Sequence, residues 1–256
     1  DHLVPVAAAI WSAGRRDIDA FPAEAFVRFF ENHGLLSLSD RPQWRTIKGG
    51  SARYVEKLTA SFGDRIRLST PVVGIRRDRD GVLVATPGQE PERFAKVVLA
   101  CHADQALDLL ADASPLERET LGAFPYAANE VVLHSDPSLL PRHRAAWASW
   151  NYFRPREERD RVAVTYHQNR LQNLAGTTPY LVTLNRTEQV DPGLVHDRFD
   201  YAHPQYDQRG VAFQPLQERL GGMNHTYFCG AYWGYGFHED GVVSAQRVAR
   251  DFGEDL

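Results

Sequence analysis

The last strand-to-helix passage of the chain reads Phe228-Cys229-Gly230-Ala231-Tyr232-Trp233-Gly234-Tyr235-Gly236-Phe237-His238-Glu239-Asp240-Gly241-Val242. Its glycines let the backbone approach a ligand closely, and the amide groups at the start of the following helix can hold an anion or a carbonyl oxygen. We therefore predict a binding place for a pyrophosphate or for the edge of a cofactor ring. Glycine-rich turns also serve as plain connectors, so this second interpretation stays open.

An α/β region is expected upstream of this passage. Three strands are expected in it, at Ile66–Ile75, Val82–Thr86 and Phe94–Cys101. The Asp80-Gly81 pair predicts a hairpin between the first two. The run Val97-Val98-Leu99-Ala100 is apolar at every position, which favours a strand buried on both faces. We expect these segments and residues 226–230 to form one mostly parallel sheet, with a helix from His102 to Ala111.

A separate antiparallel sheet is expected between residues 127 and 206, where aromatic and β-branched runs recur. Its strands are expected at Val131–His134, Ala146–Phe153, Val162–Tyr166 and Tyr180–Asn185. Helices are expected around Phe26–Phe30, after Gly49-Gly50-Ser51, and at the end of the chain. The predicted fold class is α/β with mixed α+β character, in which an antiparallel sheet interrupts the α/β part.

Composition excludes several classes of function. The 256 residues carry a formal charge of −4 at pH 7, which offers no positive field for phosphates and argues against a nucleic-acid partner. No apolar run approaches the roughly 18 residues of a transmembrane segment. Cys101 and Cys229 lie far apart in apolar runs, as expected for buried thiols in a reducing cytoplasm. The histidines lack the spacing of a zinc site, and no serine has a base beside it that the sequence can place, so we expect no metal and no hydrolase activity.

The closing passage resembles the flavin-binding signature at the carboxy terminus of the flavin-containing amine oxidases. Lys48-Gly49-Gly50-Ser51, Pro71-Val72-Val73-Gly74-Ile75 and the apolar run at 97–100 follow in the order of that family's middle region. The whole chain is similar to a bacterial group of the same superfamily, described as predicted NAD/FAD-binding proteins, on stretches such as Asn32-His33-Gly34-Leu35-Leu36 and Tyr235–Gly241. The resemblance implies part of an FAD/NAD(P)-binding fold with an inserted antiparallel substrate domain.

The resemblance also implies domain boundaries. Residues 1–40 would be the helical part of the substrate domain and residues 41–112 the middle part of the FAD-binding domain. Residues 113–222 would form the antiparallel substrate domain, and residues 223–256 would complete the FAD-binding domain. No Gly-x-Gly-x-x-Gly follows a strand in the chain, although dinucleotide-binding units carry that motif. The chain is therefore expected to be the carboxy-terminal part of a protein whose amino-terminal Rossmann βαβ segment is its missing partner, either upstream or on a separate chain.

The resemblance implies roles only for residues at positions that match the family's motifs. The implied cofactor is FAD. Val72 would meet the adenine through its backbone, and Gly230 and Ala231 would face the pyrophosphate. Asp240, Gly241 and Val242 would lie at the flavin end, with the Val242 amide directed at the pyrimidine oxygen. Gly49 and Gly50 would lie near the ring system.

The implied activity is that of an FAD-dependent oxidoreductase, in which the flavin accepts a hydride from an apolar substrate such as a fatty acyl chain, or from an amine. Asn151 and Tyr166 are the polar candidates in a cleft lined by aromatic side chains, although these aromatics are equally expected to fill a sheet and its interface. Two alternatives stay open. One is a flavin-dependent isomerase or mutase without net redox turnover, and the other is a non-catalytic fragment that holds no cofactor.

Overall fold

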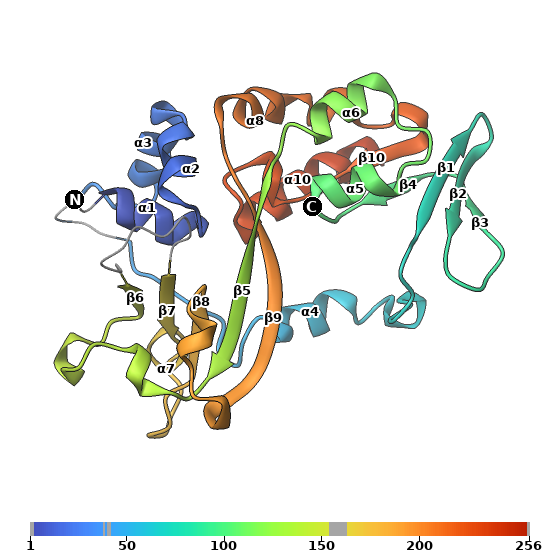
Figure 1. The fold of residues 1–256 in the computed structure, drawn as a ribbon. Helices are drawn as coiled ribbons and strands as arrows, with labels where there is room; N and C mark the ends of the chain where they lie inside the picture. The colour runs from blue at the N-terminus through green and yellow to red at the C-terminus, as the bar shows by residue number, and fades with distance from the viewer. Residues whose placement is uncertain (1–2, 38, 40–41, 154–162, 255–256) are drawn as a thin grey trace. The chain divides into compact units, whose positions relative to one another are not determined.

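The computed structural model describes residues 3–37, 39, 42–153 and 163–254 (Figure 1). The chain forms two compact units. Unit 1 comprises residues 1–20, 24–66 and 127–203, and unit 2 comprises residues 21–23, 67–126 and 204–256. This division groups residues 41–66 with unit 1, and residues 113–126 and 204–222 with unit 2, so its boundaries differ from those expected from the sequence.

Unit 1 contains the amino-terminal helices and α4. These are α1 (Leu3–Trp11), α2 (Arg15–Ala20), α3 (Ala23–Asn32) and α4 (Ala52–Thr59). Helix α3 buries Phe29 and Phe30 on one face, as their spacing predicts, and the ring of Trp11 lies 4.8 Å from that of Phe29. Helix α4 follows the Gly49-Gly50 turn as predicted, and both glycines have a φ of +87°.

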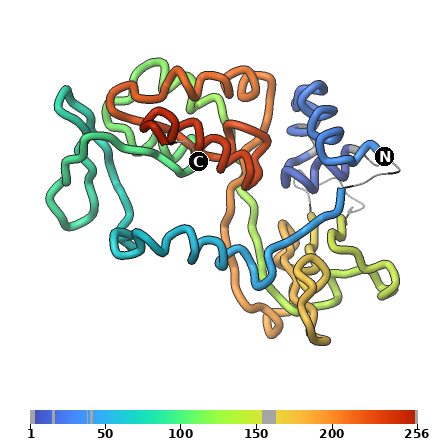
Figure 2. The backbone as a smooth tube through the Cα atoms, turned by 180° about the vertical axis from the view of Figure 1, so that it is seen from behind, coloured from blue at the N-terminus to red at the C-terminus, as the bar shows by residue number. Residues whose placement is uncertain are grey.

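A five-stranded sheet forms the rest of unit 1, in the order β6-β7-β8-β5-β9. Its strands are β5 (Tyr126–His134), β6 (Trp150–Phe153), β7 (Ala163–His167), β8 (Leu181–Leu184) and β9 (Val195–Pro204). The β6–β7, β7–β8 and β5–β8 pairings are antiparallel, which confirms the predicted sheet; Val162, expected at its third strand, lies outside the described residues. Figure 2 shows β5 and β9 as long neighbouring strands. Val131, Val164 and Leu184 pack with Ala9 of α1 in its core.

In unit 2, the predicted hairpin is confirmed. Strand β1 (Gly74–Asp78) pairs antiparallel with β2 (Gly81–Ala85), and Asp78 opposes Gly81 across the turn. Strand β3 (Glu92–Phe94) pairs with the other edge of β2. The strand expected from Ile66 begins later, at Gly74, because the segment before it exposes its apolar side chains, Leu68 for 82% of its surface, and contains Pro71, which lacks a backbone donor.

The expectation of one mostly parallel sheet is wrong. The parallel pairing is limited to β4 (Val97–Leu99) and β10 (Thr226–Phe228), which form a two-stranded sheet of their own. The run expected as one strand from Phe94 to Cys101 is divided between β3 and β4. Val98 is 42% exposed in this chain, so β4 is not buried on both faces as expected.

Helices cover the parallel pair and complete unit 2. They are α5 (Ala103–Leu109), α6 (Pro115–Leu121), α8 (Gln208–Phe213), α9 (Gln217–Leu220) and α10 (His238–Asp251); α7 (Gln168–Gln172) belongs to unit 1. Single 3-10 turns lie at Gly63–Arg65, Pro137–Leu139, Arg144–Ala146, Thr187–Gln189, Pro192–Leu194, Gln214–Leu216, Met223–His225 and Ala231–Trp233. Leu99 and Phe228 face the main core together with Ile75, Ala106 and Leu121. Among the described helices, none is both long and apolar enough to cross a membrane.

Candidate functional site

The candidate site lies in unit 2, where the parallel strands end. Strand β10 ends at Phe228, and residues 229–237 connect it to α10, which begins at His238. Strand β4 ends beside it, because Leu99 pairs in parallel with Phe228. Ligands of open α/β sheets bind beyond the carboxyl ends of such strands. The glycine-rich passage therefore lies where a ligand of this fold class is expected.

Two glutamine side chains, the half-buried Gln214 and the buried Gln217, hold the passage in place. The Nε2 group of Gln214 donates to the carbonyl oxygens of Gly234 and of Tyr232. Gln217 is 3% exposed, and its Nε2 group donates to the carbonyl oxygen of Phe228 at 3.0 Å and to that of Ser244 at 2.9 Å. Because these bonds fix the backbone on both sides of the passage, its shape is set before any ligand binds.

Ser244 joins the start of the passage to α10. Its Oγ accepts a hydrogen bond from the amide of Gly230 at 2.9 Å and donates to the carbonyl oxygen of Gly241 at 2.8 Å. A Cβ built on Gly241 would meet only the amide nitrogen of Ala231, at 3.9 Å. A side chain at position 241 would therefore enter space beside the Ala231 amide that no other described atom fills, whereas a Cβ on Gly230 would strike the ring of Tyr232 at 2.5 Å.

Asp240 caps the start of α10. Its Oδ2 accepts a hydrogen bond from the amide of Phe237 at 2.9 Å, and a Cβ on Gly234 would collide with its carboxylate. The amide of Gly241 already donates to the carbonyl oxygen of Phe237. The first amides of an α-helix lack intrahelical acceptors. In α10 these are the amides of His238, Glu239 and Asp240.

Val242, half exposed at 51%, lies in the second turn of the helix. The carbonyl oxygen of His238 is the natural acceptor for its amide. Its predicted contact with a pyrimidine oxygen stays a prediction. The amides of the first turn, which lack intrahelical acceptors, are better placed to bind a ligand.

Three polar side-chain atoms near the passage are enclosed by the protein: Tyr206 Oη, Tyr232 Oη and Trp233 Nε1. The side chains of Tyr206 and Tyr232 are 3% and 2% exposed. Burial raises the pKa of both phenols well above its ordinary value, so each is a neutral donor at any physiological pH.

The other sequence-predicted cofactor residues lie elsewhere. Val72 precedes β1 and is 37% exposed, and the amide of its neighbour Val73 donates to Ala85. Gly49 and Gly50 belong to unit 1, where the amide of Gly50 donates to the carbonyl oxygen of Ile47. The structure thus brings together Gly230, Ala231, Asp240, Gly241 and Val242. For Val72, Gly49 and Gly50, a place beside the cofactor stays a prediction.

Asn151 and Tyr166, the two cleft candidates, make contacts within the scaffold of unit 1. The side chain of Asn151 bonds to the backbone of Ala148 and to the carbonyl oxygen of Thr165. Tyr166 donates to the carbonyl oxygen of Ala9 at 3.3 Å, and burial raises its pKa to about 12. These bonds give both side chains a structural role, and their proposed place in a cleft stays a prediction.

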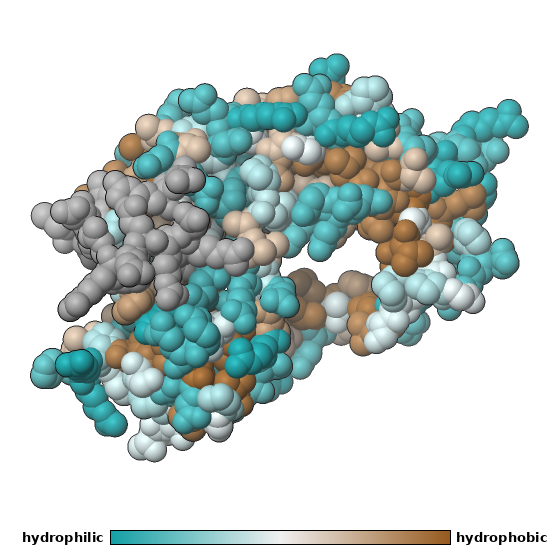
Figure 3. Space-filling view, viewed as in Figure 1, coloured by the Kyte–Doolittle hydropathy of each residue, from teal (hydrophilic) through white to brown (hydrophobic). Residues whose placement is uncertain are grey.

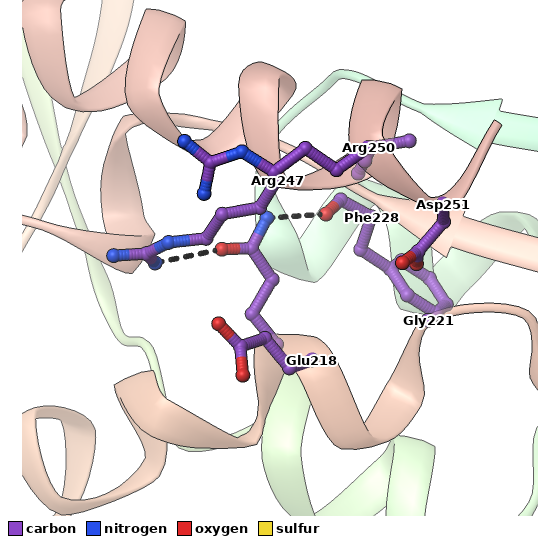
Figure 4. Close-up of a pocket in the computed structure, with 8 residues that line it drawn as sticks. Glu218, Gly221, Phe228, Arg247, Arg250 and Asp251 are labelled. Carbon is purple, nitrogen blue, oxygen red and sulfur yellow. Dashed lines mark hydrogen bonds between the residues drawn. The ribbon is translucent and has the colours of Figure 1, made fainter. Parts of the chain in front are cut away.

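A concave place lies beside the carboxy-terminal part of α10. Figure 4 shows a groove lined by Gly221 and Phe228 together with charged side chains of α9 and α10. Arg247 donates to Oε1 of Gln217 at 3.0 Å there. The groove shares Gln217 and Phe228 with the start of the glycine-rich passage and extends from there along the last turns of α10 to Asp251.

Four further residues contact the passage, although no pattern in the sequence indicates them: Ser244, Gln214, Gln217 and Tyr206. Each acts through a contact with a residue at least three positions away, and no motif surrounds it. A serine three residues after a glycine in the first turn of the helix is the one signal that could have indicated the Gly230–Gly241 bridge.

The fold that contains the parallel strand pair and the closing helix is shared with solved structures of the amine-oxidase type. Residues 19–137 match the family model described as flavin containing amine oxidoreductase, which agrees with the predicted resemblance. The family is a flavin-containing one. No curated protein matches the chain in sequence.

Solved structures share the fold at low sequence identity. The chain is similar to a CLA-producing fatty acid isomerase from P. acnes, with 17% identity, a TM-score of 0.65, and coverage of 96% of this chain and 63% of the other. It is also similar to cyclohexylamine oxidase from Brevibacterium oxydans, with 14% identity, a TM-score of 0.62, and coverage of 99% and 64%. The chain therefore spans less than two thirds of the length of these proteins.

Proposed function

We propose that the chain is the carboxy-terminal part of an FAD-dependent oxidoreductase of the amine-oxidase type. The observation that carries the proposal is the bare backbone of Gly230 and Gly241, which Ser244 ties together at the end of a parallel strand pair, with unfilled space at the Cβ position of Gly241 beside the Ala231 amide. Bare backbone and unpaired amides are what a dinucleotide cofactor requires for close approach. The family match over residues 19–137 supports a flavin as the ligand.

In this proposal each residue has a limited task. Bound FAD would supply the redox chemistry, as an acceptor of a hydride from the substrate. Gly230 and Ala231 would line the cofactor with backbone, and the first-turn amides of α10 would face its polar groups. Buried aromatic side chains such as Tyr232 and Trp233, 2% and 4% exposed, would exclude water from one side. The substrate would be apolar, with a fatty acyl chain as one class, or an amine.

We further propose that a βαβ segment outside residues 1–256 completes the cofactor site. Parallel sheets are normally covered on both faces. Helix α10 covers Tyr227 and Cys229 of the β10 segment through Val248. On strand β4, Val98 stands opposite Tyr227 and remains 42% exposed. Hydrophobic residues also gather on the surface over β1, β2 and β4 (Figure 3). A further strand and helix beside β4 would cover this surface.

Cofactor binding tests both parts of the proposal. A longer protein, in which residues 1–256 follow an upstream Gly-rich βαβ unit, should purify with stoichiometric FAD. Residues 1–256 alone should bind added FAD weakly or not at all. Tight FAD binding by residues 1–256 alone would contradict the division of the site. Failure of the longer protein to bind any flavin would contradict the proposed function.

Val98→Asp tests the proposed covering of β4 separately. In residues 1–256 the substitution should change the free energy of unfolding by well under about 1 kcal/mol, because the side chain is half exposed and such sites tolerate polar residues. In the longer protein a charge buried without a partner should cost several times more. Equal effects in the two proteins would show that nothing covers Val98.

A flavin-dependent isomerase is the second candidate function. The similar fatty acid isomerase and the similar cyclohexylamine oxidase share this fold, so the fold is compatible with either activity. Anaerobic addition of a candidate fatty acid or amine separates the two activities. An oxidoreductase loses the visible absorbance of its flavin as the substrate is oxidised, whereas an isomerase returns to the oxidised spectrum and releases a rearranged product. A protein that never holds flavin would be the non-catalytic alternative.

A further inference from the structure

Helix α4 (Ala52–Thr59) buries none of its residues, although its sequence is amphipathic. Val55, Leu58 and Phe62 follow one another at intervals of three and four residues, which places them on one face of a helix. Phe62 lies just past the end of α4, where its amide donates to the carbonyl oxygen of Thr59 at 3.0 Å. Leu58, in the middle of this face, is 67% exposed. The apolar face of α4 is therefore open in residues 1–256.

Further large apolar side chains are exposed on both sides of α4. A single exposed apolar side chain is ordinary for a soluble protein, but a large group of them marks an interaction surface. The six residues of this group belong to unit 1, and each is at least 41% exposed. We call them the α4 surface: Trp44, Ile47, Val55, Leu58, Phe62 and Ile66.

The charges of this stretch indicate the chemistry of its partner. Between Trp44 and Ile66 the sequence has five basic and two acidic residues, although the whole chain carries a formal charge of −4. One of the two acidic residues, Glu56, already pairs with Arg53 at 3.3 Å. Two copies of this basic stretch would repel each other, because like charges that meet across an interface are costly. A protein surface with acidic side chains around an apolar centre fits it better.

A bilayer surface fits the stretch less well than a folded partner does. Helices that lie in a membrane interface bury one continuous apolar face, whereas α4 has only 8 residues. Trp44 and Ile47 precede the Gly49-Gly50 turn, and Ile66 follows the 3-10 turn Gly63–Arg65. The exposed apolar residues thus come from several short elements, as in a surface that packs against another part of a protein.

The part of a longer protein that lies outside residues 1–256 is the partner that the comparisons favour. The similar fatty acid isomerase and cyclohexylamine oxidase share the fold over 96% and 99% of this chain, yet the chain covers only 63% and 64% of their lengths. Residues 44–66 lie within the range 19–137 that matches the family model, so the exposed stretch is part of the shared fold. Additional residues of a longer protein can therefore cover it.

We propose that the α4 surface docks against the segment outside residues 1–256, and that this segment presents an apolar face bordered by acidic side chains. The inference rests on the part of the proposed function that places a βαβ segment beside β4 of unit 2. It adds a second contact surface for that segment, in unit 1. Because the Gly49-Gly50 turn directly precedes α4, docking would also hold this turn, a predicted neighbour of the cofactor.

The test is Leu58→Gln in the longer protein, with Lys57→Gln as the matched control. Both positions lie in α4 and are exposed, and leucine, lysine and glutamine have similar helix propensities. Leu58→Gln should lower the denaturant midpoint of the longer protein and leave that of residues 1–256 unchanged, whereas Lys57→Gln should change neither. The α4 amides should also exchange hydrogen at least about tenfold more slowly in the longer protein than in residues 1–256.

Equal effects of the two variants in the longer protein, or equally fast exchange of α4 in both proteins, would reject the inference. Stoichiometric FAD in that same longer protein would leave the proposed function standing. A longer protein without flavin would contradict the proposed function, but slow exchange of its α4 amides would still support the docking. Slower exchange in residues 1–256 at rising protein concentration would make a second copy the occupant, and slower exchange on addition of phosphatidylglycerol vesicles would make a bilayer the occupant. Either result would overturn the inference.

Discussion

Arg77 of β1 and Glu117 of α6 form a two-pronged ion pair inside unit 2. Nη1 of Arg77 lies 2.8 Å from Oε1 of Glu117, and Nη2 lies 2.9 Å from Oε2. The two side chains are 1% and 0% exposed. Arg77 also donates to Asp112 and to the hydroxyl of Thr226, the first residue of β10. This network therefore ties the hairpin and α6 to the strand that leads into the candidate site.

Glu117→Gln should destabilise the protein strongly. Burial opposes the ionisation of Glu117, but hydrogen bonds from Arg77 and Ser114 outweigh it and hold its pKa below the ordinary value. Removing one partner of a buried ion pair leaves the other charge uncompensated, at a cost of about 3–5 kcal/mol. Asp112 remains near Arg77, so the lower end of this range is expected. Urea denaturation at pH 7 measures the change.

Arg67→Gln is the control for a pair at the surface. Arg67 and Glu92 are 2.5 Å apart, but their side chains are 60% and 46% exposed, and exposed pairs contribute about 0–1 kcal/mol. The substitution should shift the denaturation midpoint only slightly. Comparable losses from Arg67→Gln and Glu117→Gln would contradict a special role of the buried pair.

The stability of unit 1 should fall as the pH drops below 6.5. His134 is fully buried; its Nε2 donates to Oγ1 of Thr183 at 2.7 Å, and its Nδ1 accepts the amide of Asp136 at 3.1 Å. Burial lowers its pKa from the ordinary 6.5, a shift that Asp136 opposes and His196 assists. A lowered folded-state pKa means that the unfolded chain binds the proton first. Stability is thus present above 6.5 and lost as the pH falls below it, by up to about 1.4 kcal/mol per pH unit.

The pH dependence is checked by urea denaturation between pH 7.5 and 5. His134→Gln should lower the stability at pH 7.5 and flatten its decline at acid pH. A smaller slope of the same sign should remain, because burial also lowers the pKa of His167. An unchanged slope in His134→Gln would show that His134 is not the group that titrates.

Gly241→Val should remove the cofactor before it disturbs the fold. A Cβ at this position meets only Ala231 N at 3.9 Å, so the chain itself accommodates the side chain, and valine within a helix is no worse than glycine. The same side chain would occupy the open space proposed for the flavin. The longer protein carrying Gly241→Val should lose flavin absorbance and keep a near-native far-UV circular dichroism signal and apoprotein melting transition.

Gly63→Val is the matched control for this prediction. Its Cβ would also meet nothing within 4 Å, but it lies in the 3-10 turn Gly63–Arg65, far along the chain from the closing helix. It should keep both fold and flavin. Stoichiometric FAD with normal affinity in Gly241→Val would reject Gly241 as a contact.

Features that depend on local backbone preference could be predicted from the sequence. Asp80-Gly81 indicated the hairpin, and Gly81 indeed has a φ of +135° at the turn. The spacing of Phe29 and Phe30 indicated the buried face of α3. The glycines of the closing passage indicated a strand-to-helix connection with exposed backbone. In each case neighbouring residues contain the information, because turns and amphipathic helices are set within a few positions of the chain.

Features that depend on distant contacts were decided by the tertiary structure alone. The apolar run at Val97–Leu99 predicted burial on both faces, but Val98 is 42% exposed, whereas Tyr227, its neighbour across the strand pair, is buried with Val248 of α10. Ser244 became the bridge between Gly230 and Gly241, and Tyr206 came to lie against Gly236 from 30 positions away. Such partners are chosen by packing and hydrogen-bond geometry between segments that fold onto each other, and no local pattern in the sequence encodes them.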